Sequence, residues 1–453
     1  MKPHLIAIVI ALSTALAAPA SALTAGERYT LDACYTSALE HAEKIGIARE
    51  AVALAEYTRK QALSVLVPTL SAFGDYRRYS DDEYESGVLL QPEWESSYGL
   101  RLGQSFTLNG RELTALRIAE QGIEKSRTDL DATMEAYLFT VASAFFDVAR
   151  ARQAVAIAQA NVVRLEAHKQ AVTTRLKLGD VPKTELFRTQ AELASAGADL
   201  IQTRNTQKLA HSFLGRLIGV ETPIEIVEPE VSASDLESAR LPALKKLAFD
   251  RRADLKSLAL DQAIAAKQVK YTRGAYWPRL SVEGVYARIE QNPEAPLDQS
   301  SYVGASVTFD LFDGGLRRAR VSESRVVQKQ AMYSLEDARR TVAIQVEEAW
   351  RNWKTQQSVI QSFESQLLYA TENYTAVTRL FVHGMANSVD VMDANTLLVT
   401  SERKLSESRY NLQIDVLGIE RSTGVFLDGI RGRLDKQKQA AGAESPDIGR
   451  KSE

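Results

Sequence analysis

The sequence predicts a mainly α-helical chain, built as a tandem duplication, whose few β-strands have the length and pattern of transmembrane β-barrel strands. Three observations support this fold class. Proline is absent from residues 93–181 and from residues 297–445, and proline interrupts helices, so two very long helices are permitted. A segment of alternating polarity precedes each long helical stretch. The whole arrangement recurs at a spacing of about 205 residues.

The composition excludes several classes of protein. The 453 residues carry 55 Lys and Arg against 58 Asp and Glu, and this balance argues against nucleic-acid binding, which needs an excess of basic side chains. The single cysteine cannot form an intramolecular disulfide or a cysteine-rich metal site. The histidines form no ligand or catalytic motif, and we expect them, like lone serines, to lie on helix surfaces: His4, His41, His168, His211 and His383. No enzyme activity, cofactor or metal is expected.

The N-terminus predicts export. Residues 1–22 combine Lys2, an apolar run from Leu5 to Ala18 and a final Ala-Ser-Ala, the pattern of a secretory signal peptide. The alternative is a membrane anchor, but the run is shorter than the ~20 residues of a spanning helix. No later apolar run reaches that length, so any membrane span must be made of strands.

Matching segments define two repeats. Pro68, Leu70, Ser71, Gly74 and Tyr76 recur as Pro278, Leu280, Ser281, Gly284 and Tyr286, and the glycines at 179 and 219 recur at 384 and 424. We therefore expect a first repeat at 31–219, a linker at 220–240, a second repeat at 241–424, and a polar, disordered tail at 425–453. Each repeat should begin with a helix that precedes its strands.

Each repeat contains a predicted strand pair. The pairs are 68–79 with 98–108 and 278–289 with 302–312, and apolar and polar residues alternate along them. The acidic segments 81–83 and 290–298 are predicted loops between paired strands. A soluble sheet with one wet face would show the same alternation. Four strands cannot close a barrel, which needs about eight, so membrane-spanning strands would require several chains to share one barrel.

Long helices are predicted at 111–178 and 315–382, with return helices at 182–219 and 387–424. Apolar residues follow 3–4 spacing along both long helices, which predicts antiparallel coiled-coil packing. The series in the first is Val141, Ala144, Val148, Ala151, Val155, Ala158, Val162, Leu165, Lys169, Val172 and Leu176, and each member has a counterpart 205 residues later.

The ordered set of these features resembles the TolC-type outer-membrane channel family. It includes the tandem halves, the Leu311-Phe312-Asp313-Gly314-Gly315 run before the second long helix, and Gly384, Ser388, Asp390 and Asp393 after its turn. The resemblance implies a homotrimer in the outer membrane, in contact with outer-membrane lipid. Three chains would share one twelve-stranded barrel above a helical tube in the periplasm. A periplasmic membrane-fusion adaptor and an inner-membrane pump of the RND or ABC type would be partners.

The resemblance also implies functional positions. Asp390, Asp393 and Glu185 match a constriction at the periplasmic end, although the helix dipole alone would also favour acids there. Ala386 and Phe381 depart from the family pattern, so its best-known salt-bridge lock is not expected. The helical tips would contact the adaptor, although ordinary turn chemistry also explains their glycines: Leu178, Gly179, Asp180, His383, Gly384 and Met385. The junction of barrel and helices falls at Asn109, Gly110, Asp313, Gly314 and Gly315.

The sequence leaves the transported substrate open. The first expectation is an exit duct for toxic small molecules or metal ions. The second is the outer-membrane channel of a type I protein secretion system, since the same architecture serves both. A periplasmic coiled-coil scaffold with a soluble sheet is a third interpretation.

Overall fold

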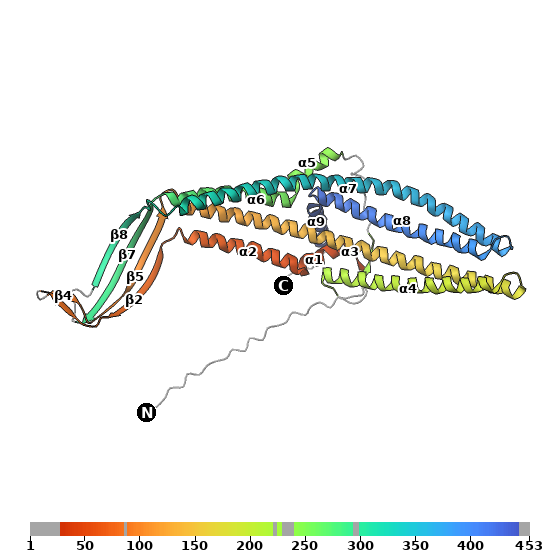
Figure 1. Cartoon of the computed structure of the whole chain (residues 1–453), viewed down its shortest axis with the longest axis horizontal. Helices are drawn as coiled ribbons and strands as arrows, with labels where there is room; N and C mark the ends of the chain where they lie inside the picture. Colours follow the sequence, from red (N-terminus) through yellow and green to blue (C-terminus); the bar gives the residue numbers. More distant parts are fainter. Residues whose placement is uncertain (1–27, 86–87, 221–223, 229–239, 293–298, 444–453) are drawn as a thin grey trace, which may run out of the picture.

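A computed structural model describes residues 28–85, 88–220, 224–228, 240–292 and 299–443. The predicted signal peptide lies outside these residues. A four-stranded sheet occupies one end of an elongated molecule, long helices lead away from it, and two helical hairpins end together at the far end (Figure 1). Among the described residues, no helix is both long and apolar enough to cross a membrane.

The sheet joins one strand pair from each repeat. Its antiparallel order is β2 (Thr69–Arg78), β5 (Trp94–Thr107), β7 (Arg279–Asn292) and β8 (Gln299–Thr308). The central β5–β7 contact joins the repeats, and β2 and β8 are left as edges. A small hairpin of β3 (Glu83–Glu85) and β4 (Val88–Gln91) lies at the outer end of the sheet (Figure 1).

Several strand boundaries differ from the sequence predictions: β5 begins at Trp94 and not at 98, and β8 begins at Gln299 and not at 302. The last strand ends at Thr308 and not at 312, while β7 continues to Asn292 through part of the predicted 290–298 loop. Glu83, predicted in a loop, begins β3. Backbone pairing extends a strand as far as its partner allows, which side-chain alternation does not reveal.

The register sorts the sheet into an apolar and a polar face. Leu100 lies opposite Ala72 and Tyr286, while the next residue, Arg101, lies opposite Ser71 and Val285. Residues paired across strands share a face. Leu70, Leu102, Val303 and Val307 thus share the face of Leu100, whereas Asp75, Glu95 and Glu283 share that of Arg101.

On the polar face the cross-strand contacts are electrostatic. Arg101 Nε lies 3.9 Å from a Glu283 carboxylate oxygen, and the Tyr302 hydroxyl donates to Glu283 at 3.0 Å. These contacts link β5, β7 and β8. Charged side chains in the middle of the sheet therefore lie on the Arg101 face, whereas Arg78, Arg288 and Glu290 lie on the other face, near the end farthest from the helices.

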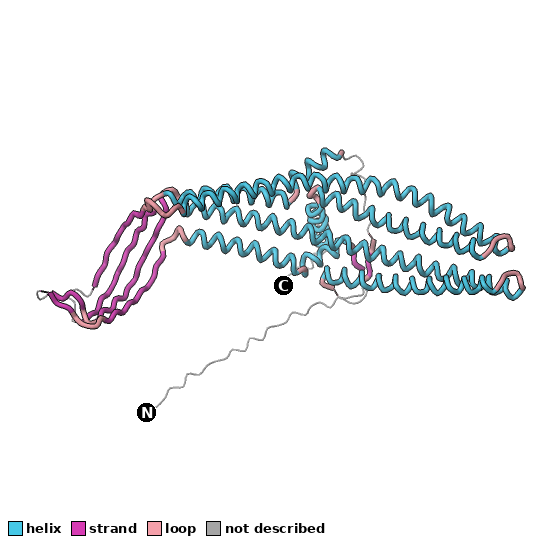
Figure 2. Tube along the Cα trace, viewed as in Figure 1, coloured by secondary structure: helices cyan, strands magenta, loops and turns pink. Residues whose placement is uncertain are grey.

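The helices repeat element by element. The first repeat contains α1 (Leu31–His41), α2 (Glu43–Ser64), α3 (Arg111–Leu178) and α4 (Lys183–Ile218). The second contains α5 (Leu241–Arg251), α6 (Ala253–Arg273), a short 3₁₀ turn at Gly274–Tyr276, α7 (Leu316–Val382) and α8 (Ser388–Ser422). At ~1.5 Å per residue, the 68 residues of α3 span about 100 Å. Figure 2 shows how far the helical part extends beyond the sheet.

The helices lie side by side in a fixed lateral order. Near the sheet the order is α2, α3, α6 and α7, and toward the tips it is α4, α3, α8 and α7. The long helix α3 is therefore central in both parts, whereas α7 lies at an edge. All members of the predicted 3–4 series on α3 are buried or half-buried, as coiled-coil packing requires.

A compact core surrounds the middle of α3. The sequence predicted a disordered tail after 425, and this is wrong for the described part, because α9 (Phe426–Ala443) is a helix. Phe426, Leu427, Ile430 and Leu434 recur at helical spacing and are buried against α1 and α3. Within the predicted linker, β6 (Glu225–Ile226) pairs in parallel with β1 (Arg28–Tyr29) and buries Ile226 in the same core.

Two glycines that follow the return helices α4 and α8 allow the chain to pack closely against the α1–α2 and α5–α6 breaks. Gly219 and Gly424 both adopt positive φ, +71° and +75°. A Cβ on Gly219 would lie 2.7 Å from His41 Cβ, and one on Gly424 would lie 2.7 Å from the backbone nitrogen of Arg252. His41 and Arg252 flank the α1–α2 and α5–α6 breaks, so the close approach is duplicated with the fold.

We expect Gly424→Ala to destabilise the protein by about 1–3 kcal/mol, because the methyl group meets rigid backbone and alanine disfavours positive φ. Thermal unfolding of the detergent-solubilised protein measures this. Gly418→Ala is the matched control, since its Cβ would meet nothing within 4 Å inside α8. There alanine should be neutral or stabilising by about 0.5–1 kcal/mol. Equal melting temperatures for the two variants would contradict the close-packing argument.

Candidate functional site

The two hairpin tips share one turn geometry. Gly179 and Gly384 adopt left-handed backbone with φ of +82° and +76°. The following residues, Asp180 and Met385, donate their backbone N–H groups to the carbonyls of Arg175 and Leu380, which is the Schellman arrangement that ends many helices. Ordinary turn chemistry therefore accounts for both glycines, and it leaves the neighbouring side chains free for another role.

The tips expose apolar side chains. Leu178 is 71% exposed and Met385 is 68% exposed, and Asp180 and His383 are exposed beside them. Behind these surfaces Val172, Val181, Phe381 and Val391 form a small buried core that joins the two hairpins. The tips thus present an exposed surface on a fixed base.

The predicted gate acids lie at the starts of α4 and α8. Asp390 and Asp393 are both exposed. Asp390 forms a capping box with Asn387, in which each residue's side chain accepts the other's backbone N–H at 3.0 Å. Asp390 therefore stabilises the start of α8 through this capping box. Asp393 makes no hydrogen bond or ion pair within the described part of the chain.

Glu185 has a different environment from the two aspartates. It is half-buried, and its Oε2 atom is buried without a hydrogen-bond partner among the described residues. No hydrogen bond or ion pair joins it to Asp390 or Asp393 within the part of the chain that the structure covers.

A buried polar cluster at the tips was missed by the sequence analysis. His168, which was expected on a helix surface, is buried with an exposure of 6%, and Ser388 is fully buried beside it. His168 Nε2 lies 2.8 Å from Ser388 Oγ, and Thr189 Oγ1 lies 3.3 Å from the same oxygen. Burial lowers the pKa of His168. The available signal was the position of His168 in the sequence, three residues after Leu165 and four before Val172 of the apolar series on α3.

Arg175 joins the tips as well. Its Nη1 donates to the Phe381 carbonyl at 2.9 Å, and its guanidinium lies 4.8 Å from the centre of the Phe381 ring. A cation at the carboxyl end of α7 is favoured by the helix dipole. The Phe381 ring also contacts His168 of α3, and the centres of these two rings lie 4.9 Å apart.

Farther from the tips, a polar network joins α3 to α8. Arg164 donates to both carboxylate oxygens of Glu402, at 3.2 and 3.0 Å, and to Asn395 at 3.1 Å. Asn395 in turn donates to Asn161 at 2.7 Å. Bidentate pairs of this kind fix geometry as well as adding energy. The network therefore sets the register between the two hairpins.

The junction residues cap the long helices. Gly110 and Gly315 precede α3 and α7 with positive φ, as does Gly314. The Asn109 side chain accepts from the Arg111 backbone N–H, and Asp313 accepts from those of Gly315 and Arg317. These residues start the helices at the sheet, which is a structural role.

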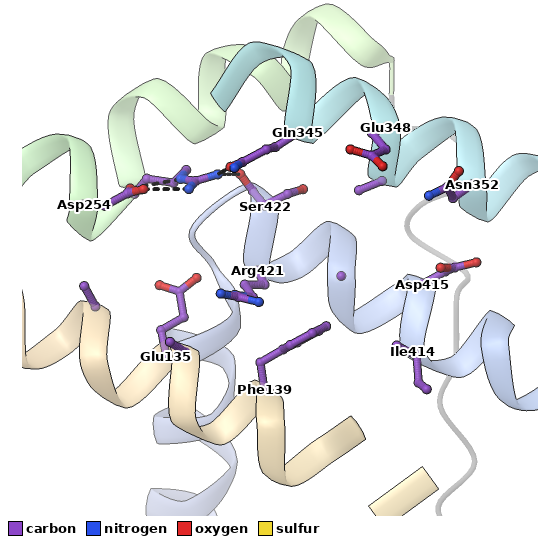
Figure 3. A pocket seen from close by; sticks show the side chains of 15 residues that line it. Glu135, Phe139, Asp254, Gln345, Glu348, Asn352, Ile414, Asp415, Arg421 and Ser422 are labelled. Carbon is purple, nitrogen blue, oxygen red and sulfur yellow. Dashed lines mark hydrogen bonds and ion pairs between the residues drawn. The ribbon is translucent and has the colours of Figure 1, made fainter. Parts of the chain in front are cut away.

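A cavity of about 590 Å³ lies between the hairpins near the middle of the molecule (Figure 3). Arg252 lines the cavity and donates to both carboxylate oxygens of Asp254 and to the side chain of Gln345. Arg421 stacks 4.7 Å from the Phe139 ring centre. The carboxylates of Glu135 and Asp415 also line the cavity.

Neither Glu135 nor Asp415 makes a hydrogen bond or ion pair within the described residues. Burial raises the pKa of Glu135 to about 7, against the lowering effect of Arg252 and Arg421, and raises that of Asp415 to about 6. Both carboxylates therefore carry a desolvation cost at neutral pH.

We expect Glu135→Gln to stabilise the protein at pH 8. The folded-state pKa of about 7 exceeds the ordinary value of 4.5, so the carboxylate destabilises the fold above pH 7, and stability returns as pH falls toward 4.5. The gain should be on the order of 2 kcal/mol at pH 8 and absent at pH 4.5, as measured by thermal unfolding across pH.

Glu347→Gln provides a control with the opposite sign. Lys245 and Arg351 lower the pKa of Glu347 to about 2, so removal of its charge should destabilise the protein at neutral pH. A Glu135→Gln variant that is equally stabilised at pH 4.5 and pH 8 would show that its effect is not the loss of a charge.

Comparison with known proteins now identifies the family. The model of the family described as "Outer membrane efflux protein" matches residues 34–220 and 244–425, which is most of both repeats. The chain is 24% identical to the outer membrane protein TolC of Escherichia coli K12, covering 81% of this chain and 76% of that protein. It is 23% identical to the alkaline protease secretion protein AprF of Pseudomonas aeruginosa, covering 78% and 72%.

Solved structures agree in fold. The outer-membrane channel OprN superposes with a TM-score of 0.78 at 17% identity, over 88% of this chain and 90% of that one. The channel CusC gives the same TM-score and identity over 87% and 92%. The predicted fold class and resemblance are therefore confirmed. The protein is an outer-membrane channel and not an enzyme, its helices extend into the periplasm, and the chain belongs to the outer membrane efflux protein family.

Proposed function

We propose that three copies of the chain close into one duct, which is the exit channel of a tripartite efflux system. It would passively conduct drugs, toxic small molecules or metal ions that an inner-membrane pump and a periplasmic adaptor deliver. The observation that carries this proposal is that the four-stranded sheet and the helical layers have no neighbouring element at their two lateral edges, among the described residues.

The open edges belong to different repeats. The sheet ends in β2 on one side and β8 on the other. The helical layers end in α2 or α4 on the first-repeat side and in α7 on the other. A head-to-tail contact between unlike edges closes into a ring when the rotation allows, and unpaired strand edges demand such a partner.

Exposed apolar residues on the helical edges support this contact. On α4, Ile201 is 71% exposed and Leu209 is 62% exposed, and on α7, Tyr369 is 72% exposed and Leu368 is 59% exposed. In the proposed trimer the α4 edge of one copy packs on the α7 edge of the next. The four-stranded sheets would form a twelve-stranded barrel, with the Leu100 face toward outer-membrane lipid and the Arg101 face toward the lumen.

Asp390, Asp393 and Glu185 are proposed to form the periplasmic gate. The aspartates are three residues apart on an exposed helix face, so a three-fold axis would gather six of their carboxylates around one constriction. Such a ring attracts cations and repels anions. Glu185 would contribute from the neighbouring hairpin.

The tips are proposed to contact the adaptor. Leu178 and Met385 provide apolar contact area, and Gly179, Asp180, His383 and Gly384 shape the surface around them. Paired apolar anchors on a rigid base suit a helical partner. The adaptor would therefore meet both hairpins of each copy.

The two candidate functions, efflux and protein secretion, differ in the inner-membrane pump that delivers substrate to the channel. The related CusC is named a cation efflux system protein and AprF an alkaline protease secretion protein, so relatives of both kinds exist. We favour efflux because the exposed acids at the tips suit small cations. Co-purification of cross-linked pump and adaptor from native membranes separates the two functions: an RND-type pump supports efflux, whereas a dedicated ABC exporter with a protein substrate supports secretion.

The double variant Ile201→Asp, Tyr369→Asp should not form trimers, because it places a desolvated charge on both sides of each contact between copies. Native mass measurement of the detergent-solubilised protein reports this. Leu178→Asp is the control, since its tip position lies outside the proposed contact, and it should remain trimeric. A trimeric double variant would contradict the edge assignment.

For the gate, Asp390→Ala with Asp393→Ala should raise single-channel current through planar bilayers, because cations are no longer held at the constriction. The wild-type current should be cation-selective. Asp390→Asn with Asp393→Asn separates charge from capping, because asparagine keeps an acceptor for the Asn387 N–H. Unchanged current in both double variants would remove these residues from the gate.

A further inference from the structure

His168 connects the four helices that meet at the hairpin tips. It projects from α3, its ring lies 4.9 Å from the Phe381 ring of α7, and its Nε2 lies 2.8 Å from the hydroxyl of Ser388, the first residue of α8. Ser388 in turn contacts Thr189 of α4 at 3.3 Å. Histidine, serine and threonine are all buried.

The hydrogen bonds have a consistent direction. Thr189 donates its hydroxyl proton to the Glu185 carbonyl at 2.8 Å, so it can only accept from Ser388. Ser388 then accepts from His168 Nε2–H. This chain of donors assigns the Nε2–H tautomer to a neutral imidazole. It runs from α3 through the start of α8 to the start of α4, where the candidate gate acids lie.

The surroundings disfavour a charged imidazole. Burial is the cause of the lowered pKa of His168. On α3 the nearest charged groups along its face are Arg164, already paired with Glu402, and Arg175, whose guanidinium lies against the same Phe381 ring. Glu185 lies one turn before Thr189 on α4, Arg379 lies on α7, and Asp390 and Asp393 follow Ser388 on α8. None of these acids makes a hydrogen bond or ion pair with His168 in the described structure.

We propose that His168 is a positioning residue that holds the two hairpin tips together while its imidazole is neutral, and that its protonation releases them. This proposal rests on the proposed gate, because the released segment carries Asp390 and Asp393. Neutral His168 fixes Ser388, and Ser388 fixes the first turn of α8.

The sign follows from linkage. An imidazole buried at the packed tips has a lower proton affinity than one exposed to water at separated tips. Acidification therefore favours the separated tips. Between the pKa of the buried imidazole and that of the exposed one, each unit fall in pH shifts the equilibrium from packed to separated tips by up to tenfold. Falling pH should open the channel, and neutral pH should keep it closed.

The test is single-channel conductance of the purified full-length protein in planar bilayers between pH 7.5 and pH 5. We expect wild-type open probability to rise on the order of threefold to tenfold over this range. His168→Gln keeps a donor for Ser388 but cannot titrate, so it should stay largely closed at both pH values. His168→Ala loses the donor and should be open at both.

His211→Gln is the matched control. His211 is a half-buried histidine of α4 whose pKa is also lowered by burial, but it lies near the middle of the molecule, where its ring donates to the Ile224 backbone carbonyl. Its variant should respond to pH as the wild type does. Repeating the series with Asp390→Asn and Asp393→Asn removes titration of the gate acids, and the His168-dependent response should persist.

The outcomes are distinguishable. A wild-type channel without a pH response, or a His168→Gln channel with the wild-type response, overturns the proposal, and the first of these needs no variant to fold. If the gate assignment is wrong, the aspartate variants will have unchanged current at pH 7.5. This result can be recognised whether or not the channel shows the His168-dependent response.

Discussion

A helix of 68 residues cannot bury its apolar stripe against itself, and this constraint determines the rest of the structure. Such a helix must be flanked along its whole length by other helices. In α3 the flanks are supplied by α2 and α6 near the sheet and by α4 and α8 toward the tips. The short helices thus meet near the middle of α3, where a compact core of α1, α9 and the β1–β6 pair forms.

The features that could be predicted are those that depend on local sequence. The missing prolines, the 3–4 series and the period-two segments are local patterns, and each predicted the right type of element. The duplication predicted the order of the second half from the first. The family resemblance was carried by the same ordered set of local features.

Features that depend on tertiary contacts were not predicted. Phe426 and Ile430 lie in a segment polar enough to suggest a tail, and only the groove beside α1 and α3 makes them core residues. The break at Ala42 has no proline or glycine to signal it. His168 was assigned to a surface because single histidines usually are, although it falls among the buried positions of α3. The proposed gate acids, in contrast, rest on the resemblance alone, and a ring of their carboxylates would require other copies of the chain.

The position of each helix, and not its sequence pattern alone, decides which polar residues become buried. His168 on α3 corresponds to Asn373 on α7, 205 residues later, yet His168 is buried and Asn373 is exposed. The reason is that α3 is central in the chain, whereas α7 lies at its edge. The duplication makes the contact of α3 with α8 equivalent to the contact of α7 with α4 of the next copy in the proposed trimer.

The two equivalent contacts differ in chemistry. Arg164 and Glu402, which form the bidentate pair within the chain, correspond to Tyr369 and Gly197 at the edges. An aromatic residue opposite a glycine can pack by shape without a fixed polar partner, whereas a half-buried ion pair is costly to separate once formed. In the proposed trimer, the contacts between copies would therefore lack the polar register of the contact within the chain. Movement of one hairpin relative to the other must break hydrogen bonds inside the protomer, and it is there that a change in protonation can act.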